Sequence, residues 1–257
     1  MNDLEAPPAP APGTDLPAAE QATRDRLYAR YRPARVVVAR PRAADASTWV
    51  VRLALVAVIA MVIGLRWWAT RAVPRKIDRT PIDVAIEPHQ EDVTDVEPIL
   101  WRHEKDAVTI KPIARYRIAG LVVGTSRYRF GWQGALVPWD VGLVWGEMAS
   151  KDVLDHIHFQ QSGRFLHYLY SAKLPVDEGY VITHAANNHW IPASDNVRRA
   201  IGQLDEGDVL EAEGYLVRAQ RADGGEWNSS LTRNDTGDGA CELMYVKRLK
   251  VGTRVYE

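Results

Sequence analysis

Two histidines and two asparagines occur close together between Thr183 and Pro192, where the chain reads THAANNHWIP. The residues of this run that could bind a ligand are His184, Asn187, Asn188, His189 and Trp190. Two His five residues apart can ligate a metal ion only when a third ligand comes from elsewhere in the fold. His and Asn also satisfy backbone groups in loops. The run is therefore a candidate ligand-binding segment, and we predict no metal site and no cofactor.

A second polar segment runs from Trp227 to Glu242. Its candidate binding residues are Ser229, Ser230, Arg233, Asp235, Asp238, Cys241 and Glu242. It contains the Asp-Thr-Gly triplet of retroviral aspartic proteases, but the polar residues 232–234 replace the hydrophobic strand that those enzymes have before the triplet. A calcium loop beginning at Asn234 would need Glu at its twelfth position, where Tyr245 stands. We interpret the segment as a tight polar hairpin whose Arg233 pairs with a carboxylate.

Cys241 permits one catalytic alternative. Together with a His and an Asn of the first segment it has the residue types of a Cys-His-Asn hydrolase. A catalytic Cys usually lies at a helix N-terminus, which lowers its pKa, whereas Cys241 is expected to begin a strand, where a lone Cys packs as a small apolar residue. The alternative to be tested is a hydrolase or metal-dependent enzyme that uses His184, His189, Asn188 and Cys241.

A Gly- and Trp-rich stretch, GWQGALVPWDVGLVWG, occupies residues 131–146. Tryptophans among Gly and Pro can line a ligand groove by stacking, although most Trp residues of a domain belong to its core. This stretch adds Trp139, Asp140 and Trp145 to the candidate binding residues.

The elements that must position these residues lie between 107 and 257. Alternating apolar residues predict strands from Val108 to Val123 with a bend at Gly120, at 165–170, at 180–183 and at 240–250, and a short helix at 147–158. Ser194 is a good N-cap for a helix that Gly207 ends, and Gly214 in the following strand suggests a sharp bend. This order predicts an α+β domain of mostly antiparallel strands, a small, partly open barrel of the oligonucleotide/oligosaccharide-binding (OB) kind with one internal helix.

An apolar run precedes the domain. Residues 47–70 contain WVVRLALVAVIAMVIGLRWWAT, with Arg and Trp confined to its two ends, as at the interfaces of a membrane span. The 20 residues from Trp49 to Trp68 match the roughly 30 Å of a bilayer core. The long stretch before the run and the lack of a small-residue cleavage site after it favour an uncleaved signal anchor. We expect a single-pass membrane protein that contacts the lipid bilayer through residues 47–70.

Charge divides the chain in two. Residues 1–76 hold 12 Lys/Arg against 6 Asp/Glu, formally +6, and residues 77–257 hold 20 against 27, formally −7. We expect residues 1–46, rich in Pro, Ala and Arg, to be disordered, and residues 71–106 to form an acidic, Pro-containing connector leading away from the membrane. A domain at −7 lacks the basic footprint of a nucleic-acid binder, so no nucleic-acid partner is expected.

The charges flanking the apolar run bear on orientation. Five arginines precede it and four positive residues follow it: Arg30, Arg32, Arg35, Arg40 and Arg42, then Arg71, Arg75, Lys76 and Arg79. This narrow excess favours the tail inside and the domain outside, in a periplasm, under the positive-inside rule.

Three stretches together are similar to an uncharacterised group of proteobacterial membrane-anchored or exported proteins. They are Pro138-x-Asp140-x-Gly142-Leu143-x-Trp145-Gly146, Ala186-Asn187-x-His189-x-Ile191-Pro192-Ala193, and Ser229-Ser230-Leu231-Thr232-Arg233-x-Asp235-Thr236-Gly237-x-Gly239-Ala240-Cys241-Glu242. The resemblance covers roughly residues 110–250. It implies bacterial origin and an envelope setting, and no particular activity.

No Walker, Rossmann, zincin, nucleophile-elbow or kinase motif appears. We therefore expect a non-catalytic module of the bacterial envelope, tethered to the inner membrane, that binds a protein partner or a ligand.

Overall fold

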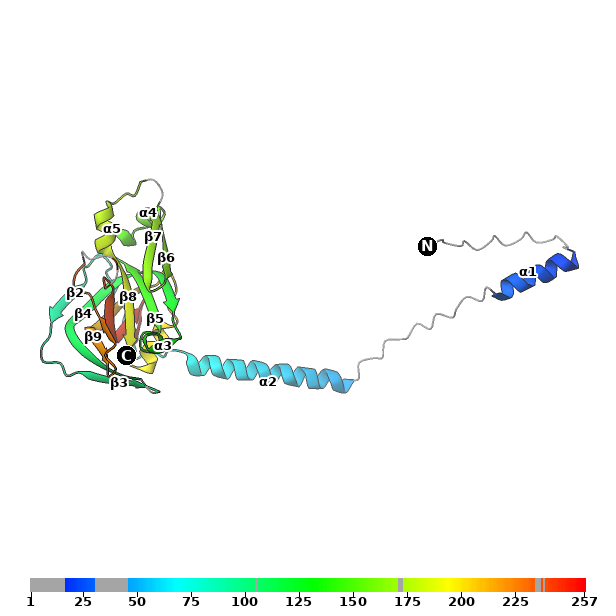
Figure 1. Ribbon diagram of the computed structural model, residues 1–257, viewed down its shortest axis with the longest axis horizontal. Helices are drawn as coiled ribbons and strands as arrows, with labels where there is room; N and C mark the ends of the chain where they lie inside the picture. Colours follow the sequence, from blue (N-terminus) through cyan, green and yellow to red (C-terminus); the bar gives the residue numbers. More distant parts are fainter. Residues whose placement is uncertain (1–16, 31–45, 105, 171–172, 234–236, 238) are drawn as a thin grey trace. The chain divides into compact units, whose positions relative to one another are not determined.

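The structure is a computed structural model (Figure 1) that describes residues 17–30, 46–104, 106–170, 173–233, 237 and 239–257. Within the tail that was expected to be disordered, it describes one helix, α1, Ala18–Arg30. Ala, Gln, Glu, Leu and Arg in this stretch are strong helix formers, which accounts for the difference. The rest of that prediction, at residues 1–16 and 31–45, lies outside the described residues.

The apolar run forms helix α2, Ala46–Thr70. Its 22 residues from Trp49 to Thr70 are apolar enough to cross a membrane, and none of the side chains in its most apolar stretch is buried. At about 1.5 Å per residue the helix from Trp49 to Thr70 is about 33 Å long, which exceeds the thickness of a bilayer's hydrocarbon core, about 30 Å. The guanidinium groups of Arg52 and Arg71 lie over the rings of Trp49 and Trp67, 5.6 and 4.9 Å from the ring centroids. A helix that could span a membrane thus precedes the domain, as predicted.

Five strands of the domain pair in a closed circuit. In chain order they are β4 (Asp106–Arg127), β5 (Trp139–Val144), β8 (Ala185–Pro192), β9 (Val209–Arg221) and β11 (Glu242–Val251). The antiparallel pairs are β4–β5, β5–β8, β9–β11 and β4–β9, and the parallel pair β8–β11 completes the circuit. The predicted fold class, α+β with mostly antiparallel strands, is confirmed, and the sheet that was predicted to form a partly open barrel is partly closed.

Alternation along these strands creates the core, because successive side chains in a strand point to opposite faces. Alternate residues of the circuit belong to one buried cluster, which includes Tyr116, Ile118, Val141, Leu143, Trp190, Leu210, Leu216, Met244, Val246 and Leu249. A second buried cluster lies under helix α3 (Gly131–Leu136) and combines Leu136 and Val137 with residues such as Ile110, Val217 and Leu243.

Two predicted bends can be compared with the sheet. Gly214 lies at a register shift between β9 and β11, and a Cβ atom built on it would stand 1.9 Å from the carbonyl oxygen of Tyr245, so the bend there is confirmed. At Gly120, where a bend was also predicted, the ladder with β9 continues without a register shift. β4 instead shifts register between Pro112 and Ala114 against β9, and between Val122 and Gly124 against β5, because its two neighbours meet it at different points.

The segment predicted to be a connector, residues 71–106, contains three short strands that join the sheet of the barrel, which corrects that prediction. Strand β1 (Lys76–Ile77) pairs with β12 (Arg254–Tyr256), and β2 (His89–Asp92) and β3 (Ile99–His103) both pair with β4. The Pro residues that suggested a linker lie between these short strands, where they interrupt no ladder hydrogen bond.

The helices differ from prediction in number and bounds. The described domain contains α4 (Lys151–Leu154), α5 (Glu178–His184) and α6 (Asp195–Ile201) besides α3, where one internal helix was expected. Ser194 caps α6 as predicted, accepting a hydrogen bond from Val197 N at 3.1 Å, but the helix ends at Ile201 and Gly207, at φ +91°, forms the turn before β9.

Two further element predictions are wrong. The strand expected at 180–183 is part of α5, because Asp177 caps that segment and accepts from the backbone N–H of Tyr180. The helix expected at 147–158 is replaced by the 3-10 turn η1 (Gly146–Ala149) and α4, and Ile157 already begins a strand. Both errors arose where apolar and β-branched residues in a short run fit either period.

An insertion between β5 and β8 covers part of the outside of the barrel. It contains the hairpin of β6 (Ile157–Ser162) and β7 (Phe165–Tyr170), which Figure 1 shows beside β5 and β8. Leu166 of this hairpin lies against Gly142, and Gln161 lies against Gly124, its partner across the β4–β5 pair. The two glycines leave space on the sheet that the hairpin fills.

Candidate functional site

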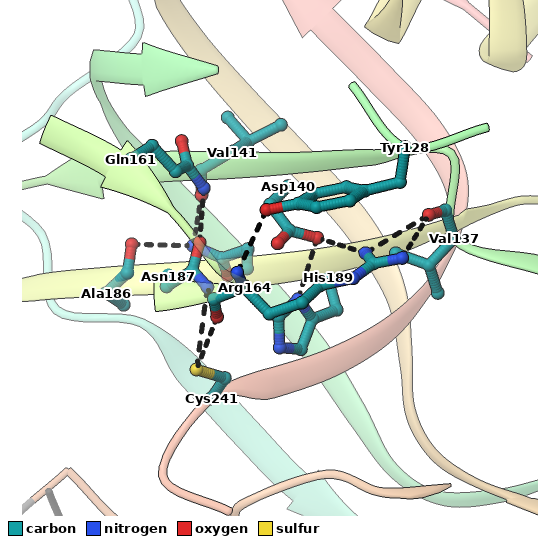
Figure 2. Close-up of polar contacts among 11 residues, drawn as sticks. Tyr128, Val137, Asp140, Val141, Gln161, Arg164, Ala186, Asn187, His189 and Cys241 are labelled. Atoms are coloured by element: carbon teal, nitrogen blue, oxygen red, sulfur yellow. Dashed lines mark hydrogen bonds and ion pairs between the residues drawn. The ribbon is translucent and has the colours of Figure 1, made fainter. Parts of the chain in front are cut away.

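A buried carboxylate, Asp140, lies at the centre of a polar cluster on the outer face of β5 and β8 (Figure 2). Its Oδ1 accepts hydrogen bonds from the guanidinium of Arg164 at 2.7 Å and from Nδ1 of His189 at 2.8 Å. Asp140 is fully buried, and its second oxygen has no hydrogen-bond partner among the described residues. Oδ1 therefore accepts both of the hydrogen bonds that this carboxylate makes with the described residues.

Sheet register explains why these residues meet. Asp140 of β5 is directly opposite His189 of β8, and Asn187 lies two residues along the same face of β8. An ionised Asp is only an acceptor, so the proton on His189 is at Nδ1 and Nε2 is an acceptor in the neutral ring. The ring of Trp227 lies 4.8 Å from that of His189.

Arg164 comes from the tip of the β6–β7 hairpin. Gly163 and Arg164 have φ of +59° and +72°, the left-handed pair that a tight hairpin turn requires. The Arg164 side chain crosses the ring of Tyr128 at 3.6 Å and also donates to the carbonyl of Val137 at 3.2 Å. A non-glycine residue in this conformation costs about 1–2 kcal/mol, which its contacts with the barrel offset.

The backbone of the same residue is held as well. Its N–H donates to the hydroxyl of Tyr128 at 3.0 Å, and its carbonyl accepts from Asn187 Nδ2 at 2.6 Å. Asn187 also accepts a hydrogen bond from Gln161 of β6, and its Nδ2 lies 3.6 Å from the sulfur of Cys241. We call Asp140, Arg164, His189, Asn187, Tyr128 and Gln161 the hairpin clamp. It fixes the tip of the hairpin over β5 and β8.

A cavity of about 260 Å³ lies beside the hairpin clamp. Its walls come from β7, α5, the first residues of β8 and the loop before β11, with Phe165, Leu166, Tyr168, Val181 and Ile182 as apolar lining and Asn187, Arg233 and Cys241 as polar lining. The two polar segments singled out in the sequence therefore meet at this cavity, at Asn187 and Cys241.

The loop from Ser229 to Cys241 is held by Arg233, which pairs with Glu242 and donates to the hydroxyl of Tyr116. The predicted pairing of Arg233 with a carboxylate is confirmed. Burial, followed by the charge of Glu242, raises the pKa of Tyr116 well above its ordinary value, so this hydroxyl stays protonated.

β10 (Glu226–Asn228) and β11 each pair with β9, while the base of the predicted polar hairpin between them is joined by a hydrogen bond from Ser230 N–H to the Cys241 carbonyl at 3.1 Å, and its apex lies outside the described residues. Ser229 and Ser230 bind backbone groups of the loop and of β11: Ser229 Oγ accepts from Leu243 N at 3.0 Å, and Ser230 Oγ accepts from Thr232 N at 3.1 Å. Asp235 and Asp238, and with them most of the calcium-loop and Asp-Thr-Gly positions, lie outside the described residues.

His184 belongs to a different cluster from His189. Its Nε2 lies 2.8 Å from Glu87 Oε1, and its ring stacks on Tyr180 with centroids 3.6 Å apart. The indole N–H of Trp145 donates to the other oxygen of Glu87 at 3.0 Å. This cluster joins the segment between β1 and β2 to α5.

The remaining candidate residues either pack in the barrel interior or lie away from the cavity. Asn188 and Trp190 are fully buried, with Asn188 Nδ2 donating to Val141 O at 3.2 Å, because they alternate with Asn187 and His189 along β8. Trp139 precedes Asp140 at the start of β5, where it lies opposite Trp190 of β8 and between the guanidinium groups of Arg127 and Arg198. The set proposed for an enzyme, His184, His189, Asn188 and Cys241, is thus divided among different environments.

Sequence reasoning missed Arg164, Tyr128, Gln161 and Glu87. The dipeptide Gly163-Arg164 between two strands signals a hairpin turn, but nothing in the sequence links that turn to Asp140, 24 residues away. Within the described residues, no three His, Cys, Asp or Glu side chains gather as a metal-binding group.

Comparison with known proteins adds no relative. No protein-family model, curated protein or solved structure matches the chain.

Proposed function

We propose that the chain is a single-pass membrane protein of the bacterial envelope whose barrel is a non-catalytic module that binds a segment of a partner protein. The observation that carries this is the position of the cavity and the hairpin clamp. In OB barrels, ligands bind on the face of the second and third strands and on the loops after the first and fourth strands. Here those strands are β5 and β8, which supply Asp140, Asn187 and His189.

The two corresponding loops also reach this face. The loop after β4 brings Tyr128 to Arg164, and the segment after β9 brings Trp227 and Cys241. Both polar segments and the insertion therefore meet where OB barrels bind ligands, which supports a binding role for this face.

The size of the cavity favours a protein partner over a free small molecule. Small-molecule pockets usually enclose about 300–1,000 Å³, whereas interface pockets accept a single anchoring side chain. A cavity of about 260 Å³ with an apolar wall suits one apolar or aromatic anchor, and Asn187 and Arg233 at its lining can orient the chain that carries it. The formal charge of −7 over residues 77–257 argues against nucleic acid.

Localisation is part of the same proposal. Helix α2 serves as an uncleaved anchor in the inner membrane, with the barrel on the periplasmic side. The sequence resemblance to proteobacterial membrane-anchored proteins and the excess of arginines before the helix support this placement.

One observation favours the rival, a hydrolase. Asp140 and His189 are joined as an acid that orients an imidazole in a catalytic triad. Against it, the same carboxylate oxygen binds Arg164, and the His189 side chain is only 5% exposed beneath Trp227. The sulfur of Cys241 contacts Asn187 and the carbonyl of Arg164.

Site-specific photo-crosslinking in bacterial cells expressing the full chain tests the proposal. A photo-reactive phenylalanine at Phe165, inside the cavity, should give discrete protein adducts, and the same residue at Tyr215, on another face, should not. Ala240→Trp fills the cavity and should weaken capture by about thirtyfold, because losing an anchor pocket costs about 2 kcal/mol.

Cys241→Ser separates binding from catalysis. A binding module keeps its adducts in this variant. Equal crosslinking from Phe165 and Tyr215, adducts unaffected by Ala240→Trp, or hydrolysis that disappears with Cys241→Ser would each refute the proposal.

A further inference from the structure

The chain enters the barrel within a few residues of the end of helix α2. Helix α2 ends at Thr70, and Ala72 is already buried in the barrel core at 5% exposure. Val73 is held by both its backbone groups: its N–H donates to Asn196 Oδ1 and its carbonyl accepts from Asn196 Nδ2, each at 2.9 Å. Asn196 is the second residue of α6.

This connection limits how far α6 can be from the helix end. Three residues of fully extended chain span at most about 11 Å. Whatever the angle between helix and barrel, α6 stays within reach of the headgroups if α2 spans the bilayer, and so does Glu257, just after β12, whose carbonyl accepts from Asn196 Nδ2 at 3.2 Å. The inference therefore rests on the membrane-anchor part of the proposed function.

The surface at this place is basic. Arginines from four separate parts of the chain line one hollow with Trp139, and we call them the arginine collar: Arg71, Arg127, Arg198, Arg199 and Arg254. Trp139 lies between two of them, with the guanidinium carbons of Arg127 and Arg198 at 5.4 and 5.7 Å from its ring centroid. A Cβ atom on Gly202 would meet the Trp139 ring at 2.6 Å, so the indole packs directly on the end of α6.

Some arginines of the acidic domain pair with carboxylates, whereas others, Arg117 and Arg218 among them, form no ion pair within the described residues. Arg164, Arg221, Arg233 and Arg248 each form an ion pair with at least one carboxylate. No collar arginine forms an ion pair with any residue that the structure describes. Asp195, in the first turn of α6, is the nearest carboxylate in sequence to Arg198 and is exposed. What distinguishes the collar is that five such arginines gather around one hollow, where an external anion can meet several of them at once.

We infer that the arginine collar binds the anionic headgroups of the bilayer that anchors the chain, so that the barrel docks on the membrane surface. Arg and Trp together suit this interface, because guanidinium groups bind phosphate in a bidentate manner and indole rings favour headgroup depth. Each cation near an anionic surface contributes about fivefold to association, so removing three predicts about a hundredfold weaker docking.

The test uses the full chain in lipid nanodiscs, with a fluorophore on Gln203→Cys in a Cys241→Ser background. Gln203 is exposed and lines the collar hollow, and Cys241 is the only cysteine. Phospholipids with a nitroxide on the headgroup quench a fluorophore that lies at the membrane surface. Discs of phosphatidylcholine alone are compared with discs that also contain phosphatidylglycerol.

We expect quenching to rise when phosphatidylglycerol is present, and to fall to the phosphatidylcholine level in the triple variant Arg198→Gln, Arg199→Gln, Arg254→Gln. A matched triple variant, Arg117→Gln, Arg218→Gln, Lys247→Gln, removes the same charge from exposed positions outside the collar and should keep the quenching. Equal quenching in both lipids, or equal loss in both triple variants, would overturn the inference. Failure of the chain to float with liposomes would instead refute the membrane anchor itself.

Discussion

At the scale of single residues, Asp140 shows how a buried charge depends on its partners. It is fully buried, while the Arg164 side chain that pairs with it is 20% exposed. Removing one partner of a buried pair leaves an uncompensated charge, which costs about 3–5 kcal/mol, whereas an exposed pair contributes about 0–1 kcal/mol. Removing Arg164 should therefore lower the free energy of unfolding more than removing an arginine from an exposed ion pair, because it leaves the buried Asp140 charge uncompensated.

We predict that Arg164→Gln lowers the free energy of unfolding by about 2–4 kcal/mol, since His189 alone remains to compensate the carboxylate. Asp140→Asn in addition should restore part of that loss, because the buried charge is gone. The measurement is urea unfolding of the full chain in nanodiscs, followed by tryptophan fluorescence.

Arg221→Gln is the matched control. Arg221 pairs with Asp106 and Asp223 at a more open site, with side-chain exposures of 26%, 17% and 57%, so its loss should cost about 0–1 kcal/mol. Similar losses for Arg164→Gln and Arg221→Gln would show that Asp140 does not depend on the hairpin.

At the scale of elements, the sequence predicted the barrel better than its insertion. Long alternating strands, the N-cap Ser194 and the bend at Gly214 are local signals, and the structure contains all three. The strand expected at 180–183 failed because a capping residue outside the run, Asp177, decided the outcome.

The site was predictable only in part, for a related reason. Asp140, His189, Asn187 and Cys241 were identified from residue type and do meet at the hairpin clamp or its cavity. Arg164 was not identified, because its role depends on a hairpin packing over paired glycines. Such packing is a long-range event that no local pattern reports.

Gly214 allows a test at this scale. Its Cβ position lies 1.9 Å from a backbone oxygen of β11, Tyr245 O, so any side chain must displace a strand. We predict that Gly214→Ala destabilises the domain by about 1–3 kcal/mol, the usual cost of overpacking.

Gly225→Ala is the control, because a Cβ atom there meets its neighbours at ordinary distances of 3.5 Å or more. Thermal unfolding followed by circular dichroism should separate the two variants by several degrees. Equal midpoints would show that β9 and β11 can separate at this point at little cost.

At the scale of the whole molecule, the former connector is the part that ties the membrane-proximal chain to the barrel. Asp78 lies just after β1 and is 3.4 Å from the buried ammonium of Lys250 and 3.6 Å from Arg248. Lys250 also donates to the carbonyl of Thr80 at 2.7 Å. A buried Lys on the last long strand is thus compensated by a segment that enters the domain first.

The pH dependence of stability should report the contact between Asp78 and Lys250. Hydrogen bonds from Thr80, followed by the contact with Lys250, lower the pKa of Asp78 from its ordinary 3.8 to about 2. A carboxyl whose pKa is lower in the folded state stabilises fully above the unfolded value, and its contribution declines as pH falls through the folded value. Asp78→Asn removes that contribution at every pH.

The difference in unfolding free energy between wild type and Asp78→Asn should be constant from pH 7 to about pH 5 and shrink between about pH 4 and 2. Asp95→Asn, which alters an exposed connector residue without an ion pair in the described chain, should show no such difference. A wild-type advantage over Asp78→Asn that persists unchanged to about pH 2, or that is absent at pH 7, would mean that this contact does not hold the connector to the barrel.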